Sequence, residues 1–414
     1  MCAEERHRVR TAGREREQAI GAFTLAGSPQ ATAAGGASGP TADEEWELPG
    51  GFARVYHADS RRGLVRPVLL ADGFNHGRSD LDALYLGLEE SFPLIGSLKE
   101  RGHDVVLLGY DDRGASILDN ARTATAAILR AIATRGGDAP LTVGGFSMGG
   151  IVTRYAPAKM EQERIDHQTA LHFSYDSPHR GAVIPIGLQA FAHFIPVANN
   201  FAKQMNSSAA RQMLWRHYDS ERGTVGVDPE REKFLEALGA VGVWPQRPRR
   251  IAVVNGRGDG QGPRVPPGQT ALASTGDRVC PGTVLLTQAE GHEAVVAELK
   301  RLFPKAGKTI TTSGFPPLDG APGGTLGSCR ILASTLEKFG ATVDPRHPDV
   351  CFVPTVSAVA IRDPDRPDDL YADVDSLPPE DGEVDEFLCS SETTGHTAIT
   401  EELCTWLLDR LPRR

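Results

Sequence analysis

The chain has 414 residues, 40% of them hydrophobic, which is enough to bury the core of one large domain with insertions or of two domains. Its 44 basic and 54 acidic residues give a net charge of −10. Since no long basic run occurs, this balance argues against a nucleic-acid groove or a patch for anionic membranes, and favours a neutral or weakly charged small-molecule substrate.

Membrane, export and metal signals are weak. No apolar run approaches the roughly 20 residues that span a bilayer, so we expect no transmembrane segment. Residues 19–33 resemble an export signal only faintly, because glutamates precede them and glycines break the apolar part. We predict a cytoplasmic protein, with secretion as the alternative. The six cysteines include no Cys-x-x-Cys pair, so we predict neither a metal nor a cofactor; export would allow Cys280 and Cys329 to pair.

The order of expected elements predicts an α/β fold. Residues 1–48 are rich in Ala, Gly, Ser, Thr and charge, and we predict a disordered tail there. From about Phe52 onward, predicted strands cover 53–56, 67–71, 104–109, 141–143, 170–175, 250–255 and 351–359, and predicted helices cover 80–101, 116–134 and 397–411. This alternation predicts one domain over 49–414, built on a mostly parallel, doubly wound sheet.

Two stretches interrupt the alternation. Residues 178–248 begin with apolar segments and continue as polar helical sequence, which predicts a cap over the sheet edge. Residues 262–345 are rich in Gly, Pro and Thr and are predicted to form a second insertion, either β-rich or loop-rich.

The most informative motif is Gly145-Phe146-Ser147-Met148-Gly149-Gly150, which follows a short apolar strand and precedes a helix start. Flanking glycines let the strand and the helix approach closely, so the hydroxyl of Ser147 would lie at the tip of a tight turn. The free N–H groups of the following helix favour negative charge at the same point. We therefore predict that Ser147 is a nucleophile.

A serine nucleophile needs a histidine base and a carboxylate that orients it. In a doubly wound sheet both come from loops after later strands, in the chain order Ser, acid, His. His396, directly before the last predicted helix, is the predicted base, with His292 as the rival. Asp259, just beyond the strand that ends at Asn255, is the predicted acid, with Asp176 as the second candidate.

Acyl transfer also requires N–H donors for the oxyanion. Met148 follows the nucleophile and supplies the first backbone N–H. The loop Asp72-Gly73-Phe74-Asn75-His76-Gly77 follows an early strand, so the N–H of Phe74 is the predicted second donor.

Taken together, these motifs resemble the α/β-hydrolase superfamily, and within it the lipase and esterase branch. The serine turn is similar to the Gly-His-Ser-Met-Gly-Gly turn of lipases, with Phe146 in place of the histidine. Ser177-Pro178-His179-Arg180-Gly181-Ala182 is similar to a Thr-Pro-His-Arg-Gly-Ser segment, and Gly395-His396 stands where the terminal histidine stands. The resemblance spans about Val65 to Leu411. It implies Ser147, Asp259 and His396 as the triad, an acyl-serine intermediate, and a structural role for His179.

The sequence thus predicts a serine hydrolase of carboxylic esters, with a lipid-like or other hydrophobic ester as substrate. The apolar stretch 182–205, with phenylalanines near helical spacing, would suit an acyl chain as a lid, or would simply pack on the sheet. Two alternatives remain: an acyltransferase, thioesterase or amidase with the same triad, and a hydrolase-like scaffold that binds without turnover.

Overall fold

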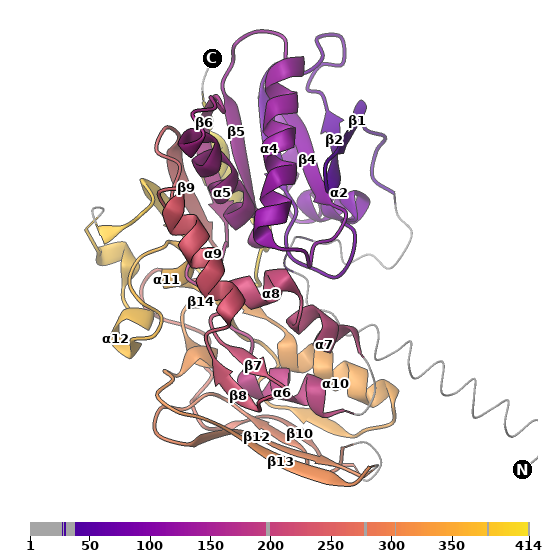
Figure 1. Ribbon diagram of the computed structural model, residues 1–414, viewed down its shortest axis with the longest axis vertical. Helices are drawn as coiled ribbons and strands as arrows, with labels where there is room; N and C mark the ends of the chain where they lie inside the picture. Colours follow the sequence, from indigo (N-terminus) through magenta and orange to yellow (C-terminus); the bar gives the residue numbers. More distant parts are fainter. Residues whose placement is uncertain are drawn as a thin grey trace, which may run out of the picture.

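The computed structural model describes Gly27, Pro29 and residues 38–195, 199–276, 280–302, 304–378 and 381–412. Most of the predicted tail 1–48 lies outside these residues. Figure 1 shows the large sheet and its helices in the upper half of the molecule and most of the two insertions in the lower half.

An eight-stranded sheet forms the frame of the fold. In spatial order its strands are β1 (Glu44–Leu48), β2 (Gly51–Tyr56), β4 (Asp104–Tyr110), β3 (Pro67–Ala71), β5 (Leu141–Phe146), β6 (Thr169–Tyr175), β9 (Arg249–Val254) and β17 (Glu386–Cys389). The six strands from β4 to β17 are parallel, whereas β1 and β2 are added antiparallel at one edge. The carboxyl ends of the six therefore meet at one edge of the sheet.

Helices cover both faces of the sheet because successive strand side chains point to opposite sides. Leu69 and Val106 pack in one core with α4 (Ile117–Thr134) and α5 (Met148–Gln162). Val68 and Val105 pack in a second core with α2 (Leu81–Glu90), α3 (Leu94–Glu100) and α13 (Glu401–Asp409). The predicted α/β class with a mostly parallel, doubly wound sheet is confirmed.

Several predicted boundaries were wrong. Strand β1 lies within the predicted tail, where it pairs with β2 along its whole length. The predicted helix 80–101 is two helices, because Pro93 restricts the backbone before it and the carboxylate of Glu89 accepts hydrogen bonds from the N–H groups of Ile95 (2.7 Å) and Gly96 (3.0 Å) at the start of α3.

The last strand of the sheet was also assigned wrongly. The predicted strand 351–359 is split into β16 (Val350–Pro354) and the short helix α11 (Thr355–Ala358). Strand β16 pairs with β14 (Gly323–Leu326) in a separate two-stranded sheet. The large sheet is completed instead by β17, which the sequence reading did not identify.

The stretch predicted as a cap is mainly helical. It contains α6 (Ile186–Phe194), α7 (Asn200–Met205), α8 (Ser208–Met213), β7 (His217–Asp219), β8 (Thr224–Gly226) and α9 (Pro229–Ala240). Phe191, Phe194 and Phe201 are all buried, so the apolar side chains of this stretch belong to the core.

The second predicted insertion holds an antiparallel five-stranded sheet. Its strands are β13 (Ala306–Thr312), β12 (Ala294–Arg301), β11 (Val284–Leu286), β10 (Thr270–Ser274) and β15 (Val343–Pro345), and α10 (Ser328–Lys338) packs beside them. Helix α6 rests on β12, and Gly187 lies so close to the backbone of Val296 that no Cβ would fit. The remaining short elements are η1 (Leu318–Gly320), α12 (Pro367–Leu370) and η2 (Val374–Ser376).

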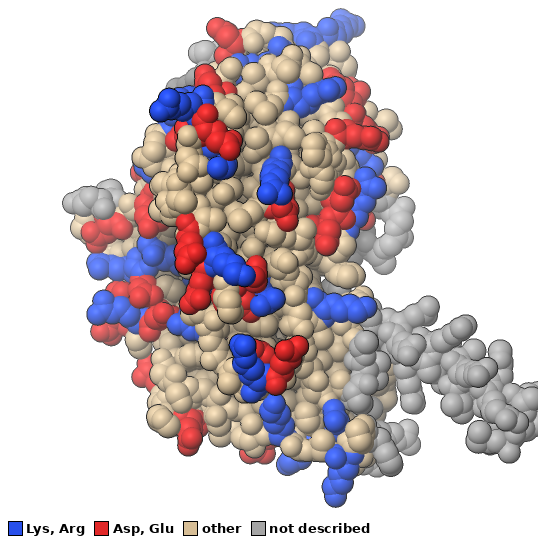
Figure 2. Space-filling view, viewed as in Figure 1, with Lys and Arg blue, Asp and Glu red and all other residues tan. Residues whose placement is uncertain are grey.

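The surface carries both signs of charge. On the face shown in Figure 2, Lys and Arg are interspersed with Asp and Glu. Within the described ranges, no helix has the length and apolar character needed to cross a bilayer. Cys280 and Cys329 are both free.

Candidate active site

Ser147 lies in a sharp turn between β5 and α5. Its backbone is in an unusual region for a residue with a side chain, with φ 53° and ψ −121°. The glycines around it are required by space: a Cβ on Gly145 would lie 2.9 Å from the Cβ of Ala71, and one on Gly149 would meet the backbone of Ala71. Strand β3, strand β5 and helix α5 can therefore meet closely enough to hold the strained turn.

His396 and Asp176 form a buried pair at the same edge of the sheet. Nδ1 of His396 lies 2.7 Å from Oδ2 of Asp176, and their side chains are 1% and 0% exposed. Asp176 directly follows β6, the neighbour of the strand that carries Ser147. Its other oxygen accepts a hydrogen bond from the backbone N–H of Asn255 at 3.1 Å. Because a carboxylate only accepts, Nδ1 carries the proton and Nε2 is left as a base.

Three further contacts hold the loop that carries His396. The side-chain amide of Asn255 donates to Oγ1 of Thr394 (2.8 Å) and to the carbonyl of Ala398 (2.9 Å). The hydroxyl of Tyr175 donates to the same carbonyl at 2.8 Å. These bonds clamp the chain on both sides of His396, so the ends of β6 and β9 fix the position of its imidazole.

The two-stranded sheet of β14 and β16 also contacts His396. The backbone N–H of His396 donates to the carbonyl of Thr325 at 2.7 Å. The ring of Phe352 meets that of His396 edge-on, with centroids 4.7 Å apart. The two-stranded sheet of β14 and β16 thus packs directly against the candidate base. Asn255, Tyr175 and Phe352 were not predicted as site residues. Asn255 and Tyr175 could have been found from their position at the carboxyl ends of parallel strands, where the site was expected.

Asp259, the predicted acid, does not reach the histidine, and we correct that assignment to Asp176. The carboxylate of Asp259 pairs with the guanidinium of Arg257 two residues earlier, with Nε to Oδ1 at 3.0 Å. Its side chain is 36% exposed. The Arg257 guanidinium is the main cause that lowers the pKa of Asp259. The glycine-rich turn after β9 thus places Arg257 next to Asp259, and this contact holds the carboxylate within the turn.

The hydroxyl of Ser147 and Nε2 of His396 are both buried, and neither has a hydrogen-bond partner among the described residues. No hydrogen bond therefore joins them in this conformation. Hydrogen bonds between a nucleophile and its base are often long without substrate and shorten when it binds.

The predicted oxyanion donors lie on two sides of the serine turn. Met148 is the first residue of α5, where backbone N–H groups have no partner within the helix. Phe74 is buried in the loop after β3, which is tightened by a hydrogen bond from the N–H of Gly73 to the carboxylate of Asp72 at 2.8 Å. The cap reaches this loop, since the amide of Gln204 lies 3.4 Å from Oδ1 of Asn75.

The other candidate histidines lie in different surroundings. His292 is exposed in the turn before β12. His179 is buried between the hydroxyl of Ser174 (2.9 Å) and the guanidinium of Arg154 (3.3 Å), and burial holds its pKa well below the usual value. Its contacts match the structural role that the resemblance implied for it.

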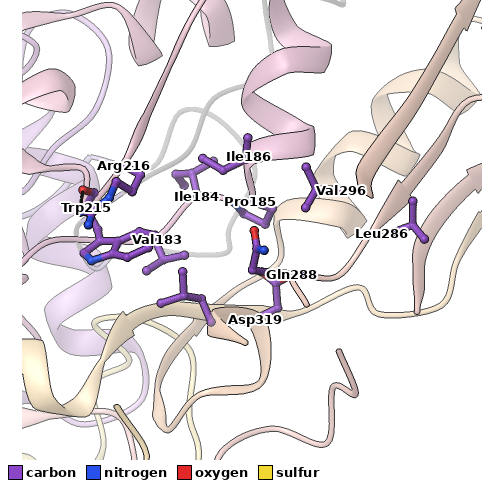
Figure 3. Close-up of a pocket in the computed structure, with 11 residues that line it drawn as sticks. Val183, Ile184, Pro185, Ile186, Trp215, Arg216, Leu286, Gln288, Val296 and Asp319 are labelled. Atoms are coloured by element: carbon purple, nitrogen blue, oxygen red, sulfur yellow. Dashed lines mark hydrogen bonds between the residues drawn. The ribbon is translucent and has the colours of Figure 1, made fainter. Parts of the chain in front are cut away.

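A small cavity lies where the cap meets the second insertion, beside Val183 and Ile184 (Figure 3). Its volume is about 10 Å³, which is room for about one water molecule. Asp319 lines it, and one of its carboxylate oxygens has no hydrogen-bond partner in the described part of the chain. Burial raises the pKa of Asp319 to about 6. A cavity of this size is too small for an ester substrate.

The chain is similar in structure to lipases and esterases. A lipase of Bacillus licheniformis matches 53% of this chain and 74% of its own, with a TM-score of 0.32 and 14% identity. An esterase of the archaeon Pyrobaculum calidifontis matches 51% of this chain and 64% of its own, just under two thirds (TM-score 0.31, 11% identity). A carboxyl esterase of the fungus Tuber melanosporum matches 55% and 70% (TM-score 0.32, 13% identity). No protein-family model and no curated protein sequence matches the chain.

Proposed function

We propose that the protein is a serine hydrolase that cleaves carboxylic esters through an acyl-serine intermediate. The observation that carries the proposal is the buried 2.7 Å contact between His396 and Asp176 at the sheet edge where Ser147 stands in a strained turn. A core has no need of a buried carboxylate and imidazole at this edge, whereas nucleophilic catalysis requires this pairing.

In the proposed reaction, Nε2 of His396 takes the proton of the Ser147 hydroxyl as its oxygen bonds to the ester carbonyl carbon. The negative charge on the carbonyl oxygen is stabilised by the N–H groups of Phe74 and Met148. Asp176 stabilises the imidazolium, which then gives its proton to the departing alcohol oxygen as the carbon–oxygen ester bond breaks. A water molecule, deprotonated by the same nitrogen, releases the acid and restores the serine.

For the substrate we propose a hydrophobic acyl or lipid-like ester. Buried aromatic side chains beside the site support this choice: Phe74 lies in the loop after β3, Phe146 precedes Ser147, and the ring of Phe352 meets that of His396. The phenylalanines of the cap are engaged in the core, so they give no separate support for a mobile lid.

The test combines a fluorophosphonate probe with p-nitrophenyl esters of increasing acyl length. We expect the probe to label the protein, Ser147→Ala to abolish labelling, and turnover to rise with chain length. Labelling that depends on Ser147 without ester turnover would instead indicate acyl transfer, thioester or amide chemistry. No labelling of a folded protein would indicate a binding scaffold.

A further inference from the structure

One residue from the beginning of the chain lies directly over the candidate nucleophile. Gly27 is buried, and its backbone N–H donates a hydrogen bond to the carbonyl of Phe74 at 2.8 Å. A Cβ built on Gly27 would lie 3.0 Å from Oγ of Ser147 and 3.2 Å from the backbone nitrogen of Phe74. Gly27 is therefore in contact with both the proposed nucleophile and a proposed oxyanion donor.

The close approach of Gly27 to the site depends on glycines, which have no side chain. Distances of 3.0 to 3.2 Å are tighter than ordinary Cβ contacts, and they involve a backbone nitrogen that cannot move aside freely. Across the contact, the carbonyl of Gly27 lies against Gly73, where a Cβ would also collide. The absence of a side chain at Gly73 therefore lets the two stretches of backbone approach closely, and a side chain at Gly27 would crowd the site.

The space that Gly27 fills is the space that an ester would need. A reacting carbonyl carbon must approach within about 3–3.5 Å of Oγ of Ser147. Its oxygen must approach the N–H of Phe74. Ser147 is 0% exposed, although its hydroxyl has no hydrogen-bond partner among the described residues.

We infer that the chain at Gly27 is an autoinhibitory segment that occupies the substrate position over Ser147. Its binding surface is formed by Gly73, Phe74 and Ser147, and its occupant is this chain itself. Substrate then reaches Ser147 only when the segment leaves. The inference rests on the proposed role of Ser147, but access to that position can be measured without catalysis.

The first test changes Gly27 in the full-length chain. In Gly27→Leu the added side chain crowds Ser147 and Phe74, so we expect the segment to leave the site. We expect fluorophosphonate labelling and ester kcat/KM to rise by at least about tenfold, because a larger fraction of molecules is open. The matched control is Gly239→Leu, at a helical position where nothing lies within 4 Å of an added Cβ, and it should leave both rates unchanged.

The second test measures access in the absence of any enzyme activity. In a Ser147→Cys background, alkylation of position 147 by iodoacetamide is followed by mass spectrometry of the peptide that carries it. We expect alkylation to accelerate by at least about tenfold when Gly27→Leu is added. Equal alkylation rates with and without Gly27→Leu, in folded proteins, together with an unchanged rate after the segment is cut off as described next, would overturn the inference.

A third arm covers the case in which the larger side chain of the Gly27→Leu variant stays in the site and blocks it. A specific protease site replaces residues 31–36, and the purified full-length protein is cut in place and dialysed. Alkylation of Ser147→Cys should then accelerate, and adding back a peptide of residues 1–30 should slow it again. If alkylation responds but no variant with Ser147 is labelled by the fluorophosphonate, the proposed function fails while the segment remains assigned. If labelling is rapid and independent of cutting, the function stands and the segment is refuted.

Discussion

Replacing each of the two candidate acids by asparagine distinguishes the buried pair of Asp176 and His396 from the exposed pair of Asp259 and Arg257. Asp176→Asn keeps the shape of the side chain but removes the charge that faces Nδ1 of His396 at 2.7 Å. The amide can present its N–H₂ group to Nδ1, which favours the tautomer with the proton on Nε2, where the base is needed. We expect kcat to fall by roughly 10³- to 10⁴-fold, as is typical when a triad carboxylate is replaced by its amide.

That loss corresponds to roughly 4–5 kcal/mol of transition-state stabilisation, because each tenfold change in rate is about 1.36 kcal/mol. Asp259→Asn removes an exposed pair with Arg257 and should leave kcat unchanged within about twofold. The measurement is steady-state hydrolysis of a p-nitrophenyl ester, with circular dichroism to verify folding. A large loss in Asp259→Asn with a small one in Asp176→Asn would refute the assignment of the acid.

Three more changes probe the site and the interior. His396→Ala should lower ester turnover by several orders of magnitude, while His292→Ala should not; retained turnover in His396→Ala would exclude it as the base. Asn255→Ala releases the clamp on the loop of His396, and we expect kcat to fall roughly 10²-fold with little change in KM. Asp319→Asn should stabilise the protein more at pH 8 than at pH 4, as measured by urea unfolding. Burial raises the pKa of the wild-type carboxyl from 3.8 to about 6, so the free energy of unfolding of the wild type falls by about 3 kcal/mol as the pH rises through these two values. A difference in stability between the two proteins that does not change with pH would contradict this.

The parts of the fold that the sequence predicted well are those in which local pattern and tertiary environment agree. Buried parallel strands are apolar along their whole length, and β3 and β4 are buried at every position. The missed strand β17 is only four residues long and mostly half-buried, so it carries no such run. The apolar run 351–359 was read as one strand because a buried strand and a short buried helix have the same composition.

The candidate site was predicted as far as chain order determines it. Ser147 and His396 each stand in a distinctive local sequence, a glycine-flanked turn and a loop shortly before the last helix. Asp176 and Asp259 both follow strands, so local sequence does not separate them. The position in space decides which of the two faces His396. Asp176 follows β6, which lies next to β5, whereas the glycine-rich turn after β9 lets Asp259 bind Arg257. Neither the strand order nor this local pairing is visible in a one-dimensional pattern.

Three residues of the candidate site have a strained backbone. Ser147, Asp176 and Thr397, the residue after the candidate base, all have left-handed φ values, of 53°, 48° and 56°. Each such conformation costs on the order of 1–3 kcal/mol and persists only where the surroundings fix it.

Here the surroundings do fix it. The N–H of Ser147 donates to the carbonyl of Tyr175 at 2.9 Å, and the N–H of Asp176 donates to that of Val253 at 2.7 Å, so these two strained residues are tied to the ends of neighbouring parallel strands. Since the pair of His396 and Asp176 is already formed and held by rigid strand ends, control by assembling it would require breaking the sheet. Uncovering the serine requires breaking the contacts of Gly27 and leaves the sheet intact, which makes access, rather than assembly, the step that this architecture can regulate.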